Sequence, residues 1–167
     1  HLFNYCKKLK IEFMSSAFDN ESLNFLTSKL KVKRIKIPSG ELTNLPLLIN
    51  IAKKNLAYLD INNVSIIEGD FKLTLENKLK KIKTVDFVFI DGNHQEKATI
   101  QYFDLILNYS HNDTIFIFDD IYWSKGMENA WNHIKHHEKS TVTIDLFFVG
   151  IVFIKKELSK ENFKIRF

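Results

Sequence analysis

Hydrophobic positions follow two different spacings along this chain, and segments of the two kinds alternate. Residues 85–90 and 114–118 are almost entirely apolar, which is typical of short strands buried on both faces. Apolar residues recur at helical spacing in residues 73–83, 97–109 and 125–137. This alternation predicts an α/β fold with a doubly wound, mostly parallel Rossmann-like sheet.

The same patterns give approximate bounds for the remaining elements. Further helices are predicted over residues 2–10, 20–30 and 43–59, and further strands over residues 11–15, 32–37, 64–68, 141–147 and 151–155. The last two strands are joined at Val149-Gly150, so we expect them to form an antiparallel pair at one edge of the sheet. The sequence has no internal repeat and no Gly/Ser linker, and we expect a single α/β domain over residues 1–167.

Composition and charge exclude several classes of protein. The net charge is +4, but the basic residues are scattered and only Arg34 and Arg166 are arginines, so we expect no nucleic-acid partner. No apolar run approaches the ~20 residues of a membrane span, and we expect neither a membrane partner nor a signal peptide. The single cysteine, Cys6, suits a reducing cytosol and predicts a cytoplasmic protein. The sequence does not indicate an oligomeric state.

Carboxylates follow two of the predicted strands directly. Asp91 comes after residues 85–90, and Asp119 and Asp120 come after residues 114–118. Ligands of open α/β sheets bind at the carboxyl ends of parallel strands, so we expect the three carboxylates at one mouth of the sheet. The alternative is structural: Asp119 and Asp120 would cap the strand end and hold loop amides.

From about residue 52 to 167 the chain resembles class I S-adenosylmethionine-dependent methyltransferases in their later half. The matching segments are Asn63–Asp70 (NVSIIEGD), Val85–His94 (VDFVFIDGNH), Ile117–Met127 (IFDDIYWSKGM) and Val142–Phe153 (VTIDLFFVGIVF). Their order and spacing fit the family, as does the closing strand pair. The resemblance implies S-adenosylmethionine as the cofactor and a small-molecule substrate.

The resemblance also implies residues that bind the cofactor. Asp70 would accept from the adenine amino group, with Phe71 beside the ring; Asp70 is also a suitable N-cap for the helix that follows. By its position Glu41 would take the ribose hydroxyls. Ser15 and Ser16 lie in the loop that would cradle the methionine part. The family uses a glycine-rich turn there, and this loop has no glycine, which predicts impaired binding.

A subset of O-methyltransferases places Mg²⁺ on acidic residues at positions like Asp91, Asp119 and Asp120. Hard cations prefer oxygen ligands, and a bound metal lowers the pKa of a substrate hydroxyl. Other members of the family carry the same acids without a metal. His94 would be the general base or a proton relay together with Asp91, or else a loop histidine bonded to the backbone.

Two aromatic residues follow the acidic pair. Tyr122 and Trp123 would form a wall of the acceptor pocket, or would pack under the next helix. The sequence leaves both alternatives open.

Residues 1 to about 50 resemble a different family, N-acetylneuraminate (sialic acid) synthase. The matching segments are Tyr5–Lys8 (YCKK), Ile11–Asp19 (IEFMSSAFD) and Ile35–Leu48 (IKIPSGELTNLPLL). The family is a TIM barrel that condenses phosphoenolpyruvate with an amino sugar, and the resemblance makes Lys36 and Ser39 phosphate ligands. Only two βα units are covered, so the barrel cannot close from this sequence.

The chain is therefore interpreted as a hybrid with a seam near residues 49–55. A gene fusion, an assembly error and a designed chimera would all produce it. The principal hypothesis is methyl transfer from S-adenosylmethionine to a small hydroxyl or amine acceptor, with or without a metal ion. The alternatives are a fragment of an N-acetylneuraminate synthase and a folded, non-catalytic hybrid.

Overall fold

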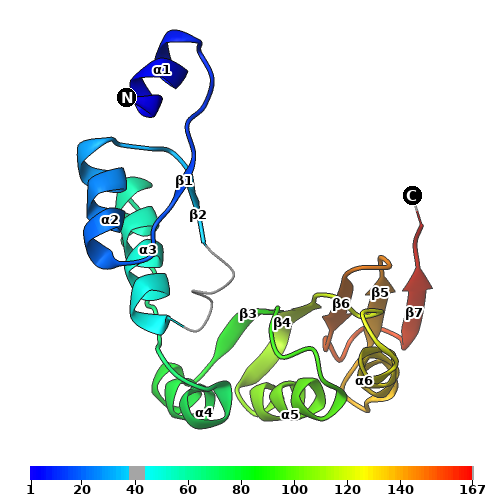
Figure 1. Ribbon diagram of the computed structural model, residues 1–167. Helices are drawn as coiled ribbons and strands as arrows, with labels where there is room; N and C mark the ends of the chain where they lie inside the picture. The colour runs from blue at the N-terminus through cyan, green and yellow to red at the C-terminus, as the bar shows by residue number, and fades with distance from the viewer. Residues whose placement is uncertain (38–43, 167) are drawn as a thin grey trace. The chain divides into compact units, whose positions relative to one another are not determined.

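The computed structural model describes residues 1–37 and 44–166, and for Leu45 the backbone alone (Figure 1). These residues form two compact units, His1–Glu68 and Gly69–Phe167, which are described separately. Unit 1 contains α1 (Leu2–Lys8), β1 (Ser15–Ser16), α2 (Asn20–Asn24), the π-helix η1 (Phe25–Lys29), β2 (Ile35–Lys36) and α3 (Leu45–Tyr58). Unit 2 contains α4 (Phe71–Ile82), β3 (Val85–Ile90), α5 (Glu96–Leu107), β4 (Ser110–Phe118), α6 (Lys125–His136), β5 (Val142–Asp145), β6 (Gly150–Phe153) and β7 (Glu161–Lys164).

Unit 1 is a small α/β arrangement. β1 and β2 pair in parallel, with Ser15 opposite Ile35 and Ser16 opposite Lys36. A capping box starts α2, because the Ser22 amide donates to Asp19 Oδ1 over 2.6 Å. The core of unit 1 is formed by Ala17, Leu23, Leu26, Leu47 and Ile51.

Several predictions for residues 1–68 need correction. The strands predicted over residues 11–15 and 32–37 are each reduced to two residues, and the helix predicted over 20–30 continues as a π-helix after Asn24. Residues 64–68 form no strand. Each of them is exposed, so their apolar side chains gain nothing from a strand conformation there.

Unit 2 is built on a five-stranded sheet in the order β3-β4-β6-β5-β7. β3 and β4 are parallel, β6 is antiparallel to both β4 and β5, and β7 is parallel to β5. The antiparallel pair predicted near the end of the chain is therefore confirmed, but its predicted place at the edge of the sheet is wrong, because β7 lies beyond β5. The carboxyl ends of β3, β4, β5 and β7 consequently lie along the same edge of the sheet.

Two features of this sheet differ from the prediction. β4 begins at Ser110, so residues 111–113, predicted as a loop, belong to the strand. Ser110 pairs with Val85 across an irregularity in the register, and backbone pairing thus extends the strand beyond its apolar segment. β7 was not predicted, because the strand has only four residues and most of them are polar. All four are exposed in the structure.

One face of the sheet in unit 2 carries the core. Phe116, Phe118 and Val152 are buried there against Phe103 of α5 and Trp131 of α6. Leu79 of α4 belongs to the same cluster, and Figure 1 shows α4, α5 and α6 on one side of the sheet. Ser124 caps the start of α6, since its hydroxyl accepts from the Met127 amide.

The opposite face of the sheet is also apolar. It presents Phe87, Phe89, Ile117, Ile151 and Phe163, none of which is buried. Phe87 and Phe89 are 59% and 54% exposed. Among the described residues, no helix has the length and apolarity needed to span a membrane.

Candidate functional site

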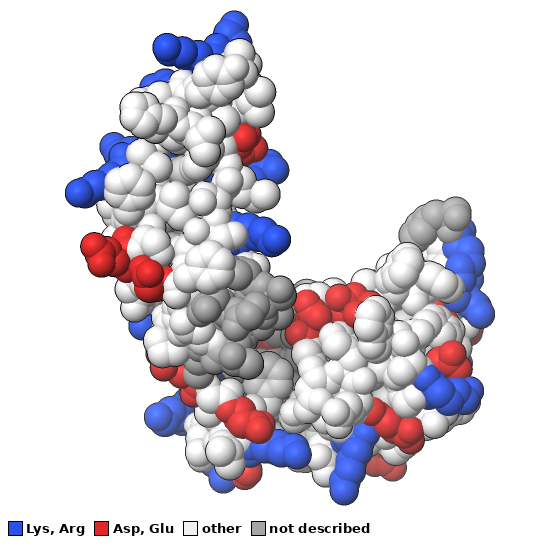
Figure 2. Space-filling model, in the orientation of Figure 1, with Lys and Arg blue, Asp and Glu red and all other residues white. Residues whose placement is uncertain are grey.

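The predicted carboxylates meet where β3 and β4 end. The Asp119 amide donates to the Ile90 carbonyl over 3.0 Å, which joins the last residue of β3 to the first residue after β4. Asp91 follows Ile90 directly, and Asp120 follows Asp119. Figure 2 shows acidic side chains gathered over the ends of these two strands. The geometry expected from the parallel pair is therefore present.

His94 lies between two of these carboxylates. Its Nε2 atom is 3.6 Å from Asp91 Oδ1 and 3.9 Å from Asp120 Oδ2. These distances suit electrostatic attraction rather than direct hydrogen bonds, which are shorter. The His94 side chain is 27% exposed, so it is sheltered but can still be reached by a small molecule.

Two residues with a left-handed backbone conformation shape the turns that carry His94 and Asp120. Asn93 has φ 50° and Asp120 has φ 53°, a conformation that Asn and Asp adopt more readily than other non-glycine residues. The Asn93 side chain also donates to the Tyr102 hydroxyl over 3.2 Å, which anchors the first turn to α5. These turns set the backbone positions of His94 and Asp120.

The predicted adenine-binding pair begins α4. Asp70 caps the helix, since its Oδ1 accepts from the Lys72 amide over 2.8 Å. Phe71 is 49% exposed and packs edge-to-face on Tyr102, with ring centroids 5.6 Å apart. A Cβ on Gly92 would lie 3.2 Å from the Phe71 ring. Phe71 therefore lies beside the turn that follows Asp91, and the capping role of Asp70 is confirmed.

Tyr122 is bonded to a buried carboxylate that the sequence did not single out. Its hydroxyl donates to Asp145 Oδ2 over 2.5 Å. Burial, together with this hydrogen bond, raises the pKa of Tyr122. The Asp145 carboxylate also accepts from the Phe147 amide and from Arg166 Nη1, each over 3.0 Å. Burial alone would raise the pKa of Asp145, but these three hydrogen bonds outweigh it and lower the pKa.

Aromatic side chains extend from this carboxylate toward solvent. Phe147 stacks on Tyr122 with centroids 5.8 Å apart and meets Phe148 edge-to-face at 4.8 Å. Trp123 is 71% exposed, which contradicts tight packing under α6. A carboxylate inside the strand predicted over residues 141–147 was a signal for Asp145, although the observed β5 ends at that residue. Arg166 had no such signal, because its place depends on the unpredicted β7.

The predicted magnesium site gains no support. Within residues 1–37 and 44–166, no three His, Cys, Asp or Glu side chains are arranged to hold a metal ion. Asp91 and Asp120 each approach His94, as described above.

The predicted site residues of the first half lie in unit 1. Ser15 and Ser16 form β1, and Lys36 is an exposed residue of β2 opposite Ser16. Ser39 and Glu41 lie outside the described residues. The assignments of these residues to ligands stay predictions.

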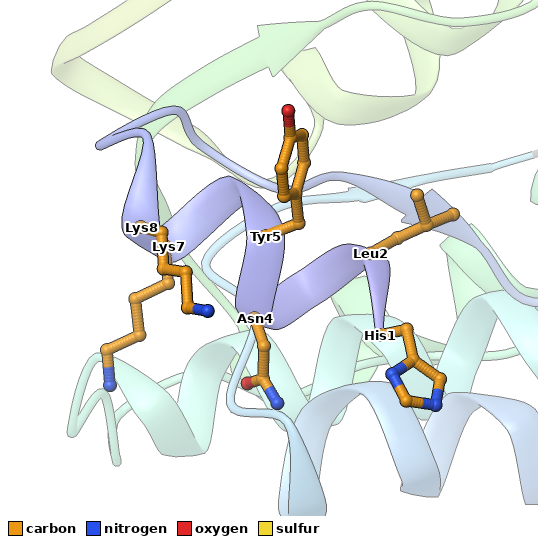
Figure 3. Close-up of a pocket in the computed structure, with 6 residues that line it drawn as sticks. All are labelled: His1, Leu2, Asn4, Tyr5, Lys7 and Lys8. Carbon is orange, nitrogen blue, oxygen red and sulfur yellow. The ribbon is translucent and has the colours of Figure 1, made fainter.

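A surface hollow in unit 1 lies around α1. Figure 3 shows Leu2 and Tyr5 on one side of this helix and His1 and Asn4 on the other. The side chains diverge, and Leu2 and Tyr5 are 71% and 61% exposed. The hollow is therefore not a convergent binding site. Its lining consists of His1, Leu2, Asn4, Tyr5, Lys7 and Lys8.

The fold and the site of unit 2 define an α/β domain whose polar groups gather at the carboxyl ends of parallel strands, where such domains bind ligands. Residues 44–121 match the model of a methyltransferase domain family, and residues 1–59 match the NeuB family. The chain thus joins a sialic acid synthase-like segment to a methyltransferase-like domain. Both matches include α3.

The curated relatives are named as synthases. The chain is 54% identical over 55 residues to N,N'-diacetyllegionaminic acid synthase of Legionella pneumophila, and 40% identical over 83 residues to the enzyme of the same name from Campylobacter jejuni. It is 50% identical over 52 residues to N-acetylneuraminate-9-phosphate synthase of Drosophila melanogaster. These alignments cover 33%, 48% and 31% of this chain but only 15%, 25% and 14% of the relatives.

A solved structure resembles the chain over most of its length. It is the crystal structure of a putative O-methyltransferase from Klebsiella pneumoniae, with a TM-score of 0.54 and 14% sequence identity. The match covers 92% of this chain and 78% of that one. At this identity the likeness establishes the fold, a mixed α/β arrangement in which parallel strand pairs predominate.

Proposed function

We propose that the methyltransferase-like domain transfers a methyl group from S-adenosylmethionine to a hydroxyl or amine group of a small molecule. The observation that carries this proposal is His94, held between Asp91 and Asp120 at the carboxyl ends of β3 and β4. The family match over residues 44–121 names the reaction class.

The proton to be moved is that of the acceptor group. As the acceptor oxygen or nitrogen forms its bond to the methyl carbon, its proton passes to His94 Nε2. The positive charge that develops on the imidazole is stabilised by the Asp91 and Asp120 carboxylates, 3.6 and 3.9 Å away. S-adenosylmethionine, when bound, would supply the methyl group from its sulfonium sulfur; the S–CH₃ bond would break as the new bond forms, and neutral S-adenosylhomocysteine would leave with the electron pair on sulfur.

The start of α4 suits the adenine part of this cofactor. The Phe71 ring is half-exposed and offers a face for stacking. Asp70 uses Oδ1 as the helix cap, and its Oδ2 has no partner among the described residues, so it is available to an exocyclic amine. Contacts of Ser15 and Ser16 with the methionine part, and of Glu41 with the ribose, are part of the proposal.

Magnesium ligation by Asp91, Asp119 and Asp120 stays a prediction, and no step above depends on it. Its test is activity after treatment with a chelator, followed by addition of Mg²⁺. We expect activity to survive the chelator, because His94 supplies the base. A loss of activity that Mg²⁺ restores would contradict the metal-free mechanism.

We also propose a doubly wound architecture, and a single domain over residues 1–167 with a seam near residues 49–55. The apolar second face of the sheet supports the first of them, because a sheet of this class is covered on both faces. The proposed reaction does not depend on an intracellular setting or on a particular oligomeric state.

Thermal unfolding with S-adenosylhomocysteine tests the proposal. A ligand that binds only the folded state adds about 2.7 kcal/mol at a hundredfold excess over its Kd, so the midpoint should rise. Phe71→Ala should remove most of the rise. Phe163→Ala is the matched control, since both rings are 49% exposed. A cooperative transition that the ligand leaves unmoved would reject the proposal and favour a folded, non-catalytic hybrid.

The second candidate is a phosphoenolpyruvate-dependent condensation, as in a sialic acid synthase fragment. The identity of 54% over 55 residues favours it. Lys36 and Ser39 would bind the phosphate. The small share of the relatives that is present argues against a complete site, and the ligand test in the Discussion separates the two candidates.

A further inference from the structure

Basic residues follow β7 at the same edge of the sheet as the candidate site. Lys164 ends β7 opposite Asp145, and the Ile165 amide donates to the Asp145 carbonyl over 2.9 Å. Because β7 is parallel to β5, and β5 runs in the direction of β4, Lys164 and Arg166 lie at the edge where Asp120 follows β4. Figure 2 shows basic side chains over β7.

Arg166 uses only part of its guanidinium group within the protein. Its Nη1 donates to the Asp145 carbonyl and Oδ1, both over 3.0 Å, and to the Ile165 carbonyl over 2.8 Å. Nε and Nη2 make no hydrogen bond to any described residue. An arginine with two neighbouring donor groups of this kind binds a carboxylate or phosphate in a bidentate manner.

The charge presented to solvent here is positive. The Asp145 side chain is 6% exposed and is occupied by Tyr122, the Phe147 amide and Arg166. Lys164 has no ion-pair partner in the described part of the chain, and its Nζ lies 6.0 Å from the Tyr122 ring centroid. Two cations and one buried anion therefore leave a net positive charge.

Exposed aromatic rings lie beside these cations. Arg166 Cζ is 5.4 Å from the centroid of Phe147, which stacks on Tyr122 and is 47% exposed. The loop that carries Phe147 and Phe148 is joined to the candidate site, because the Ile121 amide donates to the Phe148 carbonyl over 3.2 Å. Rings flanked by cations complement a molecule that has both an apolar ring and an anionic group.

We propose that the methyl acceptor is a ring-bearing carboxylic acid. Its carboxylate binds Arg166 Nε and Nη2 and Lys164 Nζ, and its ring packs against Tyr122 and Phe147. This assignment of the substrate class rests on the proposed methyltransferase function, but the binding of the anion can be measured without it.

The test is an NMR titration of the whole chain with benzoate, and with neutral benzamide as the uncharged match. Benzoate should shift the amide signals of Phe147, Lys164 and Arg166, and benzamide should bind at least about tenfold more weakly, since a charge-assisted hydrogen bond contributes about 1.5–3 kcal/mol. Lys164→Gln should weaken benzoate binding by about tenfold. The matched control is Lys156→Gln, which removes the same charge after β6, at the opposite edge of the sheet.

Arg166→Gln should abolish benzoate binding, but it also removes a partner of Asp145, so Lys164→Gln decides the outcome. The assignment is overturned if neither ligand binds, if benzamide binds as well as benzoate, or if the two lysine variants are equally affected. The S-adenosylhomocysteine shift distinguishes the two proposals. If benzoate binds but S-adenosylhomocysteine does not raise the midpoint, the anion site stands and methyl transfer is rejected. If S-adenosylhomocysteine raises the midpoint but benzoate does not bind, only the acidic acceptor is rejected.

Discussion

A histidine between two carboxylates is the smallest unit from which the chemistry follows. We expect His94→Gln to lower kcat by about 10²–10⁴-fold, the usual contribution of a general base, with little change in the unfolding midpoint. The kcat is measured from the transfer of labelled methyl groups from S-adenosylmethionine to an acceptor that the wild-type protein methylates.

His111→Gln is the matched control for this substitution. His111 Nε2 also lies beside a carboxylate, 2.8 Å from Asp86 Oδ1, but near the start of β4 rather than its end. Equal losses of kcat in both variants would show that His94 acts on the fold rather than on the acceptor.

The second prediction at this scale concerns stability. Asp145→Asn removes a buried charge and leaves Arg166 without its ion-pair partner, so we expect a loss of about 2–3 kcal/mol in denaturant unfolding. This is less than for a fully buried pair, because the Arg166 side chain is 37% exposed. Asp113→Asn is the control: that carboxylate pairs with Lys155 but is 67% exposed, and its loss should cost less.

The dependence on pH follows from the lowered pKa of Asp145. Its stabilisation is fully present above the unfolded pKa of about 4 and is lost as the pH falls through the lower pKa of the folded state. The wild-type protein should therefore lose stability more steeply below pH ~4 than Asp145→Asn does. Parallel curves for the two proteins would contradict this assignment.

At the scale of the elements, the approach of β6 to α6 requires a glycine. A Cβ on Gly150 would lie 2.7 Å from two carbons of the Trp131 ring, and Trp131 is buried. We expect Gly150→Ala to cost about 1–3 kcal/mol by overpacking, measured by chemical denaturation.

The control within the same layer is Gly126→Ala in α6. Its Cβ would lie 3.4 Å from the nearest atom, which is ordinary contact, and alanine is the better helix former. This variant should be neutral or more stable by up to about 1 kcal/mol. A destabilisation as large as that of Gly150→Ala would mean that the two layers do not pack as described.

The elements also show which parts of the fold the sequence contains. β3 was predicted because five of its six residues are apolar, and hydrophobicity alone carries that signal. The burial expected on both faces of this strand is wrong, since none of the six residues is buried. Residues 64–68 carry a similar signal and form no strand, since a strand needs a partner that periodicity does not supply. β7 has the reverse property: its pairing with β5 stabilises four exposed residues that have little propensity of their own.

Some contacts of the candidate site could likewise be predicted from the sequence, and others could not. The meeting of Asp91 with Asp120 could be predicted, because each follows a strand and the two strands are parallel. The contacts of Asp145 with Tyr122 and Arg166 could not, since they span 23 and 21 residues and the second depends on β7.

At the scale of the whole molecule, two families contribute to one chain, and ligands can decide which contribution remains functional. We expect phosphoenolpyruvate to leave the unfolding midpoint unchanged, because the chain spans 15–25% of the two diacetyllegionaminic acid synthases it matches. S-adenosylhomocysteine is the positive control in the same experiment. A rise with phosphoenolpyruvate that Lys36→Ala removes would favour the synthase fragment.

The helix α3 lies within residues 44–59, which both family models match. A helix depends on short-range hydrogen bonds and on the spacing of its apolar residues, and unrelated sequences can meet both requirements. A genetic crossover at any codon in this interval would consequently leave an intact helix, with no new loop and no shift of phase. Recombination between unrelated genes should therefore be tolerated more often inside such shared helices than at strand boundaries, where a one-residue slip turns every side chain to the other face.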